Sequence, residues 1–262
     1  IYGAPEEADW TSEKIWKQAN PSLGITVDVD KLKAACENAK QNPAEENLFR
    51  QLRLNQWVKQ SVRWMPMSKW DACAFPVDEE SLRGRTCYGG LDLSSTTDIT
   101  AFVLVFPPLE DADKFQILPF FWIPEDNIGQ RVRRDHVPYD IWEQQGFLYT
   151  TEGNVVHYGF IEEFIDELSS KYNIREIAFD RWGAVQMVQN LEGLGFTVVP
   201  FGPGFKDMSP PTKALMRLTL DEKLAHSGHP VLRWMVVNIF VRSDPAGNIK
   251  PVPFTHLTLP AH

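Results

Sequence analysis

The feature that most constrains the fold is the order of apolar patterns from Thr86 onward. Residues 87–95, 98–107 and 115–124 are β-forming runs separated by a turn and an acidic loop. Three such runs in succession predict an antiparallel meander. Beyond this meander the chain alternates between helical and β-forming segments. A meander followed by such alternation indicates an α/β fold with a mixed sheet flanked by helices.

Apolar spacing separates the helices from the strands in the second half of the chain. Residues 157–174 place apolar side chains on one helical face, whereas the short apolar run IREIAFD ends at Asp180. Segment 135–153 predicts a helix followed by a short hairpin. Further helices are predicted over 184–195 and 210–225, with a strand over 196–202 between them.

The first 80 residues have a different character. Helical spacing recurs in 9–21 and 27–43, and a further helix begins with Pro43, a residue that suits the first helical position. We therefore expect a helical arm over 1–80 and the main domain over 81–251. The ending, which includes THLTLP, resembles translated adapter sequence, so residues 252–262 are predicted to be a non-native tail.

Composition narrows the compartment and the partners. No run approaches the roughly 20 apolar residues that cross a bilayer, and no signal-type leader is present, so we expect a cytoplasmic protein without a membrane partner. Cys36, Cys73 and Cys87 form no C-x-x-C pair, which predicts free thiols. The net charge of −9 argues against binding nucleic acid by bulk electrostatics, since phosphates favour basic surfaces.

Two aspartates stand at strand positions where a carboxylate needs a reason. Asp92 lies between Leu91 and Leu93 in a β-forming run, and Asp180 ends the strand IREIAFD. If the two strands are neighbours, the carboxylates converge, and a divalent cation would relieve their repulsion. Mg²⁺ and Mn²⁺ prefer carboxylate and water ligands. The alternative is that each aspartate only caps a turn through its own backbone.

The order of several motifs extends this reading. GGLDLSSTTDITAFVLVFP, IAFDRWGAVQMVQNLEGLGF, the MSPPTKAL helix start and DPAGNIKP together resemble the nuclease domain of tailed-phage terminase large subunits. The upstream IWKQANPSLG resembles the segment that joins the motor of these proteins to the nuclease. The resemblance covers roughly residues 10–251. It implies a ribonuclease H-like fold and an endonuclease that cuts concatemeric DNA with two Mg²⁺ or Mn²⁺ ions.

The resemblance also assigns roles and partners. Asp92 resembles the metal ligand of the first strand and Asp180 the second ligand. The third acidic ligand of the family lies after the DPAGNIKP turn, in a segment that this chain lacks, and Asp244 in the turn is not assigned to that role. The chain therefore resembles a domain truncated at its C-terminus, whose cleavage activity is in doubt.

The implied partners are double-stranded DNA, the portal protein, the small terminase subunit and the ATPase domain of a longer chain. The implied location is the cytoplasm of an infected or lysogenic bacterium, outside the finished virion. No G-x-x-x-x-G-K-[ST] motif occurs, and GPGFKD at 202–207 lacks the Lys-Ser/Thr pair, so no ATPase activity is expected from these residues.

Several other polar residues are secondary candidates, each with a structural alternative. Asp98 could reach a metal through water or cap the turn. His226 and His229, three residues apart across a Ser-Gly turn, favour structural roles over metal binding. The residues predicted to contact the DNA backbone, with solvated surface positions as their alternative, are Arg131, Arg133, Arg134, Lys206 and Lys213.

Two other functional classes remain open at this point. The same fold could serve as a non-catalytic docking module for the portal or the small subunit, with Asp92 and Asp180 as turn caps. A wide separation of the two carboxylates would favour that module. Another ribonuclease H-like enzyme, such as a resolvase or transposase, is a third possibility, against which the ANPSLG and DPAGNIKP segments weigh.

Overall fold

The chain forms two units, which meet between Trp64 and Met65 in the sequence. The computed structural model describes residues 3–5, 8–41, 43–56, 64–94, 98–110, 113–126, 128–180 and 185–253. No helix in these ranges is long and apolar enough to cross a membrane.

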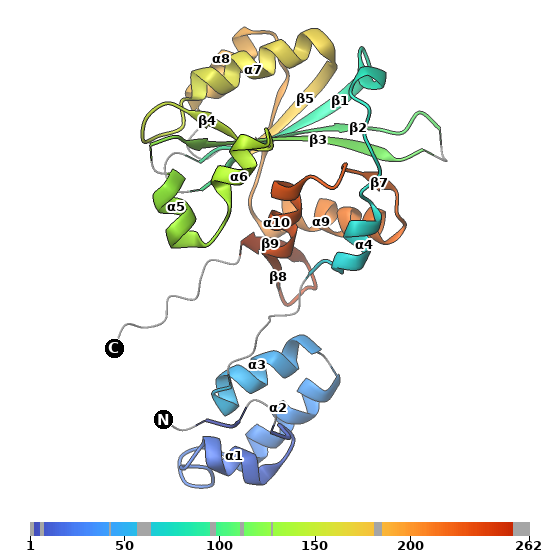
Figure 1. Ribbon diagram of the computed structural model, residues 1–262. Helices are drawn as coiled ribbons and strands as arrows, with labels where there is room; N and C mark the ends of the chain where they lie inside the picture. The colour runs from blue at the N-terminus through green and yellow to red at the C-terminus, as the bar shows by residue number, and fades with distance from the viewer. Residues whose placement is uncertain are drawn as a thin grey trace. The chain divides into compact units, whose positions relative to one another are not determined.

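The first unit is helical, as its sequence predicts (Figure 1). It consists of α1 (Glu13–Ala19), α2 (Val29–Gln41) and α3 (Pro43–Leu54). Their apolar faces share a small core in which Trp16 and Phe49 lie edge to face, with ring centroids 6.0 Å apart. The helices therefore stabilise one another by burying these aromatic rings.

The second unit begins earlier than the predicted boundary at residue 80. Helix α4 (Met67–Ala72) packs within it, because Trp70 stacks on His226 with ring centroids 4.3 Å apart. Asp71 also forms an ion pair with Arg233, at 2.7 Å between Oδ1 and Nε. The Trp- and Met-rich segment is thus part of the larger unit rather than of the helical arm.

A mixed seven-stranded sheet organises the second unit, in the order β4-β3-β2-β1-β5-β6, with β7 beside β3. Strands β1, β2 and β3 form the predicted antiparallel meander, and β5 and β6 run parallel to β1. This arrangement confirms the ribonuclease H-like mixed sheet. The strand bounds are β1 (Thr86–Asp92), β2 (Thr100–Phe106), β3 (Phe115–Pro124), β4 (Tyr149–Thr151), β5 (Asn173–Asp180), β6 (Val198–Phe201) and β7 (Leu224–Ala225).

The two faces of the sheet are covered by different helices (Figure 1). Helices α7 (Tyr158–Lys171) and α8 (Val185–Gly193) cover one face and share its core with buried residues of β1 and β2. Helices α9 (Phe205–Leu220) and α10 (Pro230–Val237) lie on the other side, together with α4.

Segment 128–153 differs from its sequence-based prediction. The arginine-rich residues form a helix, α5 (Ile128–Asp135), which is followed by α6 (Tyr139–Gln144). The predicted hairpin is absent from this described segment, because β4 pairs in parallel with the end of β3, through Trp122 and Tyr149. A three-residue strand carries too little pattern for its partner to be read from the sequence.

A two-stranded hairpin of β8 (Ile239–Ser243) and β9 (Ile249–Pro253) ends the described part of the chain. It is fastened to α9, because the backbone N–H of Ile249 donates to Ser209 Oγ at 3.1 Å. Residues 252 and 253, which were assigned to the predicted tail, belong to β9, and the rest of that tail lies outside the described residues.

A short 3₁₀ helix, η1 (Glu80–Leu82), precedes β1. Its Leu82 is fully buried in the core beneath α7. The turn therefore anchors the entry to the central strand of the sheet.

Candidate functional site

The register of β1 and β5 brings the two predicted site residues to adjacent positions. The strands run parallel, and Leu91 pairs with Phe179, so Asp92 and Asp180 follow at the next position of each strand. Neighbouring strands are about 4.8 Å apart. The backbones of the two aspartates are thus close, although the side chain of Asp180 lies outside the described residues.

Asp92 itself is exposed, and strand alternation explains why. Cys87, Gly89 and Leu91 point into the core under α7, whereas Asp92 belongs to the alternate, exposed set of β1. Its carboxylate therefore keeps access to water while its backbone remains in the sheet, which avoids the cost of burying a charge.

The turn between β1 and β2 is stabilised by hydroxyl groups. The N–H of Ser94 donates to Thr100 Oγ1 at 3.0 Å, and that hydroxyl donates to the carbonyl of Ser94 at 3.0 Å. The N–H of Asp98 donates to Ser94 Oγ at 3.0 Å. Asp98 is exposed at the same end of the sheet as Asp92, so its predicted role in contacting a metal through water is neither excluded nor established by this turn.

The three arginines of α5 do not form one exposed patch. Arg131 is 5% exposed, and its guanidinium lies over the Tyr139 ring, 5.5 Å from the centroid. Burial lowers the pKa of Arg131, and the nearby Asp98 acts in the opposite direction. Arg134 pairs with Asp135 at 2.6 Å, which leaves Arg133 as an exposed cation for which no ion pair is recorded among the described residues.

Burial therefore removes Arg131 from the predicted DNA-contact surface. Its charge is close enough to Asp98 to affect its pKa, which places α5 near the β1–β2 turn. Periodicity could not reveal this, because a charged residue in a short polar helix is read as solvent-facing by default.

The predicted lysines lie near the end of β6. Phe201 of β6 pairs with Asp180, and the following loop leads directly into α9, which carries Lys206 and Lys213. Lys206 is exposed, and the ammonium group of Lys213 donates to the carbonyl of Gly247 at 3.1 Å. Both lysines are thus on the helix that begins beside the Asp180 strand.

Sequence reasoning missed a third lysine in this region. Lys250 of β9 donates from Nζ to the carbonyl of Pro203 at 3.1 Å, in the loop between β6 and α9. Its position depends on the hairpin folding back onto α9, which no local pattern predicts.

Asp244, the acid at the DPAGNIKP turn, has a structural role. Its Oδ1 accepts from the backbone N–H groups of Ala246 and Asn248, and its Oδ2 accepts from the Asn248 amide. These hydrogen bonds hold the pKa of Asp244 below its ordinary value. The decision not to assign it as the third metal ligand agrees with this geometry.

His226 and His229 also have structural roles. His226 is buried, with Nδ1 accepting from the N–H of Gly228 at 3.2 Å and Nε2 lying 3.0 Å from the carbonyl of Trp70. His229 Nδ1 caps α10 by accepting from the N–H of Leu232 at 3.4 Å. Burial lowers the pKa of His229 to about 4, because the neutral ring suits its apolar surroundings.

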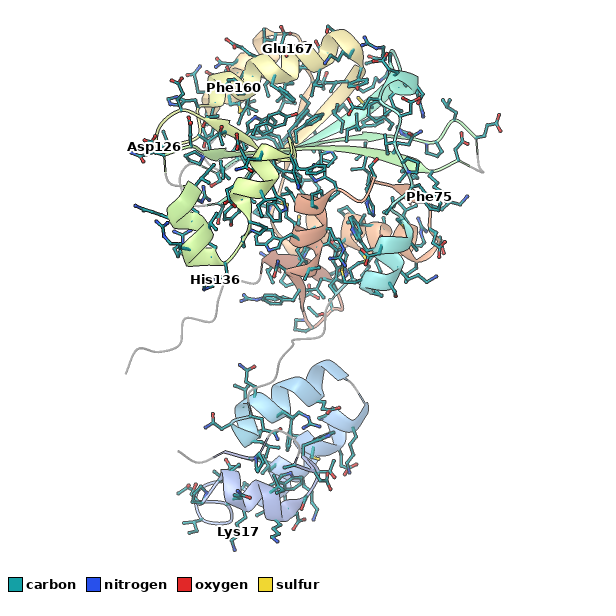
Figure 2. All side chains as sticks on the ribbon, viewed as in Figure 1. Lys17, Phe75, Asp126, His136, Phe160 and Glu167 are labelled. Atoms are coloured by element: carbon teal, nitrogen blue, oxygen red, sulfur yellow. The ribbon has the colours of Figure 1, made fainter. Side chains whose placement is uncertain are left out.

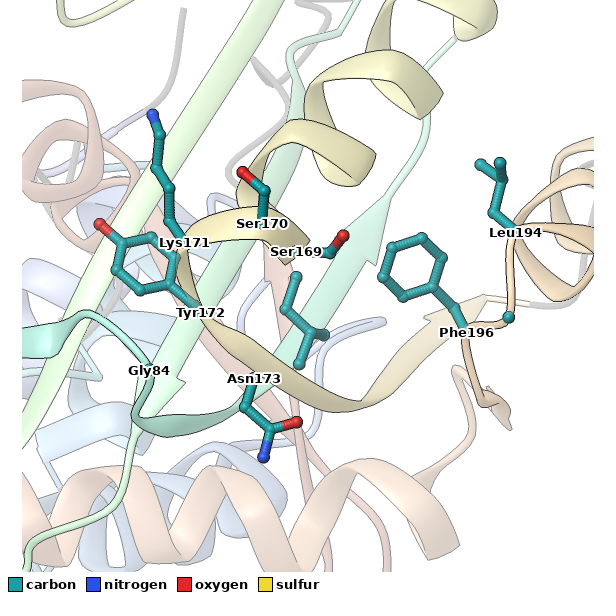
Figure 3. A pocket seen from close by; sticks show the side chains of 10 residues that line it. Gly84, Ser169, Ser170, Lys171, Tyr172, Asn173, Leu194 and Phe196 are labelled. Carbon is teal, nitrogen blue, oxygen red and sulfur yellow. The ribbon is translucent and has the colours of Figure 1, made fainter.

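A pocket of about 390 Å³ lies at the opposite end of the sheet (Figure 3). It is lined by the end of α7, by the start of β5 at Asn173, and by Phe196. Asn173 pairs with Thr86, the first residue of β1, whereas Asp92 and Asp180 end their strands. The pocket is therefore separate from the candidate site and does not bear on its chemistry.

Donor chemistry decides which residues could hold a metal. Among the side chains that the structure describes, no group of three or more His, Cys, Asp and Glu residues is placed to bind an ion. That set excludes the carboxylate of Asp180. The exposed Asp92, beside the position of Asp180 in register, fits a cation that prefers carboxylate and water ligands.

Comparisons with known proteins follow the same direction. The sequence matches the family described as terminase large subunit, endonuclease domain, over residues 1–254. It is 36% identical over 253 residues to the terminase large subunit of Enterobacteria phage HK97, covering 95% of this chain and 49% of that protein. Protein YmfN of Escherichia coli strain K12 is 25% identical over 261 residues, with 96% of this chain and 57% of YmfN covered.

A solved structure agrees with these sequence matches. The crystal structure of the HK97 bacteriophage large terminase is similar with a TM-score of 0.66 at 36% identity, covering 96% of this chain and 52% of that one. The chain thus spans about half the length of its HK97 relative. Because the family match extends over almost the whole sequence and the fold agrees, the chain belongs to the family of terminase large subunit endonuclease domains.

Proposed function

We propose that this chain is a metal-dependent endodeoxyribonuclease that cuts concatemeric double-stranded DNA at the start and end of genome packaging. One observation carries the proposal: the parallel register of β1 and β5 puts Asp92 and Asp180 at neighbouring strand ends. Open α/β sheets bind their ligands at the carboxyl ends of their strands. Family membership supports the assignment of this end of the sheet to DNA cleavage.

Asp92 and Asp180 would hold Mg²⁺ or Mn²⁺, with two ions expected and Asp98 assisting through water. When bound, such ions lower the pKa of a water molecule and stabilise the leaving oxygen of a phosphodiester. Asp92 is exposed, so a DNA phosphate can approach its carboxylate without displacing packed side chains. The net reaction adds the oxygen of water to phosphorus and breaks one phosphorus–oxygen ester bond.

The cationic residues near this end would position the DNA backbone. Arg133, Lys206 and Lys213 are exposed on α5 and α9, and phosphate contacts fix register without reading sequence. Few such contacts predict weak binding by the isolated chain, consistent with its net charge of −9. Delivery of the DNA by a motor would compensate for this weakness.

The packaging role extends this proposal to the longer protein. The chain covers about half of its HK97 relative, so the remaining half would supply the ATPase motor. The portal protein and the small terminase subunit are the proposed docking partners, in the cytoplasm of the bacterial host. The alternative of a purely docking module is weakened by the adjacent register of Asp92 and Asp180.

Supercoiled plasmid tests the proposed function directly. With Mn²⁺ or Mg²⁺ the chain should nick or linearise the plasmid, and EDTA should stop the reaction. Asp92→Asn should abolish cutting, whereas Asp221→Asn, an exposed aspartate at the end of α9 and far from β1, should not. Equal cutting by wild type and Asp92→Asn would overturn the assignment of Asp92.

A further inference from the structure

The central strand of the sheet has one face that no helix covers. β1 has β2 and β5 as neighbours on its two sides, yet Thr86, Tyr88, Gly90 and Asp92 are all exposed. Tyr88 is 43% exposed despite its large ring. Central strands normally bury an aromatic side chain, so this exposed face needs an explanation beyond packing.

The surface beside Asp92 is low and open. A Cβ atom added to Gly90 would have no heavy atom within 4 Å. Gly90 pairs with Ala178 on β5, directly before the two aspartate positions, and with Val103 on β2. A ligand approaching Asp92 along β1 would therefore meet no tall side chain at Gly90.

Charge distinguishes this side of the sheet from the opposite side. Lys206, Lys213 and Lys250 gather around the loop from β6 to α9, which lies on the side away from α7 (Figure 1). The outer surface of α7 instead carries exposed carboxylates, including Asp166 and Glu167 (Figure 2). A polyanion would be attracted to the first side and repelled by the second.

We propose that the exposed face of β1 seats the DNA backbone and that Tyr88 is a positioning residue for cleavage. Tyr88 is four residues from Asp92, about 13 Å along the strand, a distance that a duplex covers in about four base pairs. The Tyr88 hydroxyl donates to a phosphate, and its ring contacts the adjoining sugar. This inference rests on the proposed function and adds the path by which DNA reaches Asp92.

Equilibrium binding tests the role of Tyr88 without depending on metal or cleavage. A fluorescent 20-base-pair duplex is titrated with the 262-residue chain in EDTA and low salt, and anisotropy gives the Kd. Tyr88→Phe, which loses only the hydroxyl, should raise the Kd about threefold, and Tyr88→Thr, which also loses the ring, about tenfold. Thr is chosen because it retains strand preference.

A matched aromatic position provides the control. Phe160 on α7 is 48% exposed, close to the value for Tyr88, and lies among the carboxylates of the opposite side (Figure 2). Phe160→Ala should leave the Kd unchanged. Wild-type affinity in Tyr88→Thr, or an equal loss in Phe160→Ala, would overturn the inference, as would the absence of any binding by the wild type.

Gly90→Val gives a second test by raising an obstacle beside Asp92. Because the added atoms enter open space, the melting temperature should stay unchanged while the Kd rises about tenfold. In cleavage assays, both Gly90→Val and Tyr88→Thr should raise KM with little change in kcat. Normal binding by a folded Gly90→Val protein would contradict the proposed path.

The two proposals fail in different ways. If Asp92→Asn binds DNA but no longer cuts it, while the Tyr88 and Gly90 variants bind and cut normally, only the binding path is wrong. If Asp92→Asn cuts at the wild-type rate, the proposed catalytic site is wrong, whatever the Tyr88 variants show.

Discussion

The two faces of β1 differ in what their residues do, although they alternate along one strand. On the face under α7, Gly89 is closely packed, because an added Cβ would lie 2.9 Å from Phe102 Cε2 and 3.1 Å from Ile177 Cγ1. On the opposite face, the neighbouring Gly90 has open space above it. Two adjacent glycines thus serve different purposes, one for packing and the other for access.

This difference separates residues that hold the fold from residues available for function. Cys87 and Leu91 are explained by the core that they share with α7. Tyr88 and Asp92 receive no such explanation, since both are exposed in a central strand. Function is therefore best sought on the face where packing does not account for the residues.

Asp92→Asn is expected to give the largest effect, and on function alone. Loss of the carboxylate charge should slow plasmid cleavage by about 10³-fold, equivalent to about 4 kcal/mol of activation free energy. Because Asp92 is exposed, the melting temperature should change little. A large fall in melting temperature would mean that Asp92 belongs with the packed face.

The adjacent glycines give the next effect, on stability alone. Gly89→Ala should lower the free energy of unfolding by about 2 to 3 kcal/mol, because Phe102 and Ile177 must move. Gly90→Ala should change it by less than about 0.5 kcal/mol. Urea denaturation of both variants measures the contrast, which equal losses would remove.

His229 should make stability depend on pH where the second face is covered. Its ring packs against Phe121 and Phe147, and its folded pKa of about 4 is below the unfolded value. The unfolded chain therefore binds the proton first, so stability is complete above about pH 6.5 and falls as pH drops toward 4. We expect about 2 kcal/mol of this loss at pH 4.5.

Urea titrations at pH 7 and pH 4.5 measure the contribution of His229. His229→Asn retains a capping acceptor for α10 but cannot titrate, so its stability should fall less between the two pH values. Equal pH dependence in the variant and the wild type would assign the effect to other groups, including the neighbouring His226.

Sequence and structure agree most closely at the meander and at the strand ends. Alternation in 86–124 predicts β1 to β3, and the buried run before Asp180 predicts β5, from which a shared edge with Asp92 follows. Pairing across long separations was less accessible. The partner of β4 and the position of Lys250 depend on tertiary contacts that local periodicity does not encode.

The domain boundary and Arg131 failed for a related reason. The segment around Trp70 has helical character like the arm before it, but its partner His226 is 156 residues away in the sequence. Arg131 is a polar residue whose burial depends on packing against Tyr139. Neither association produces a signal within a short window of sequence.

The smallest expected effect comes from the exposed ion pair of Asp71 with Arg233, which joins α4 to α10. Both side chains are nearly half exposed, so Arg233→Met should cost less than about 0.5 kcal/mol. The difference from wild type should shrink further in 0.5 M salt. A loss above 1 kcal/mol in chemical denaturation would show that this surface contact contributes as the packed face does.

The buried thiols provide each unit with an internal record of its opening. Cys36 is in the helical unit, whereas Cys73 and Cys87 are in the sheet unit, and all three are free. Desolvation raises the pKa of each thiol, to about 12 for Cys87. A thiol reagent would thus modify a cysteine only when its surroundings open, so site-resolved labelling rates would report separately how often each unit unfolds.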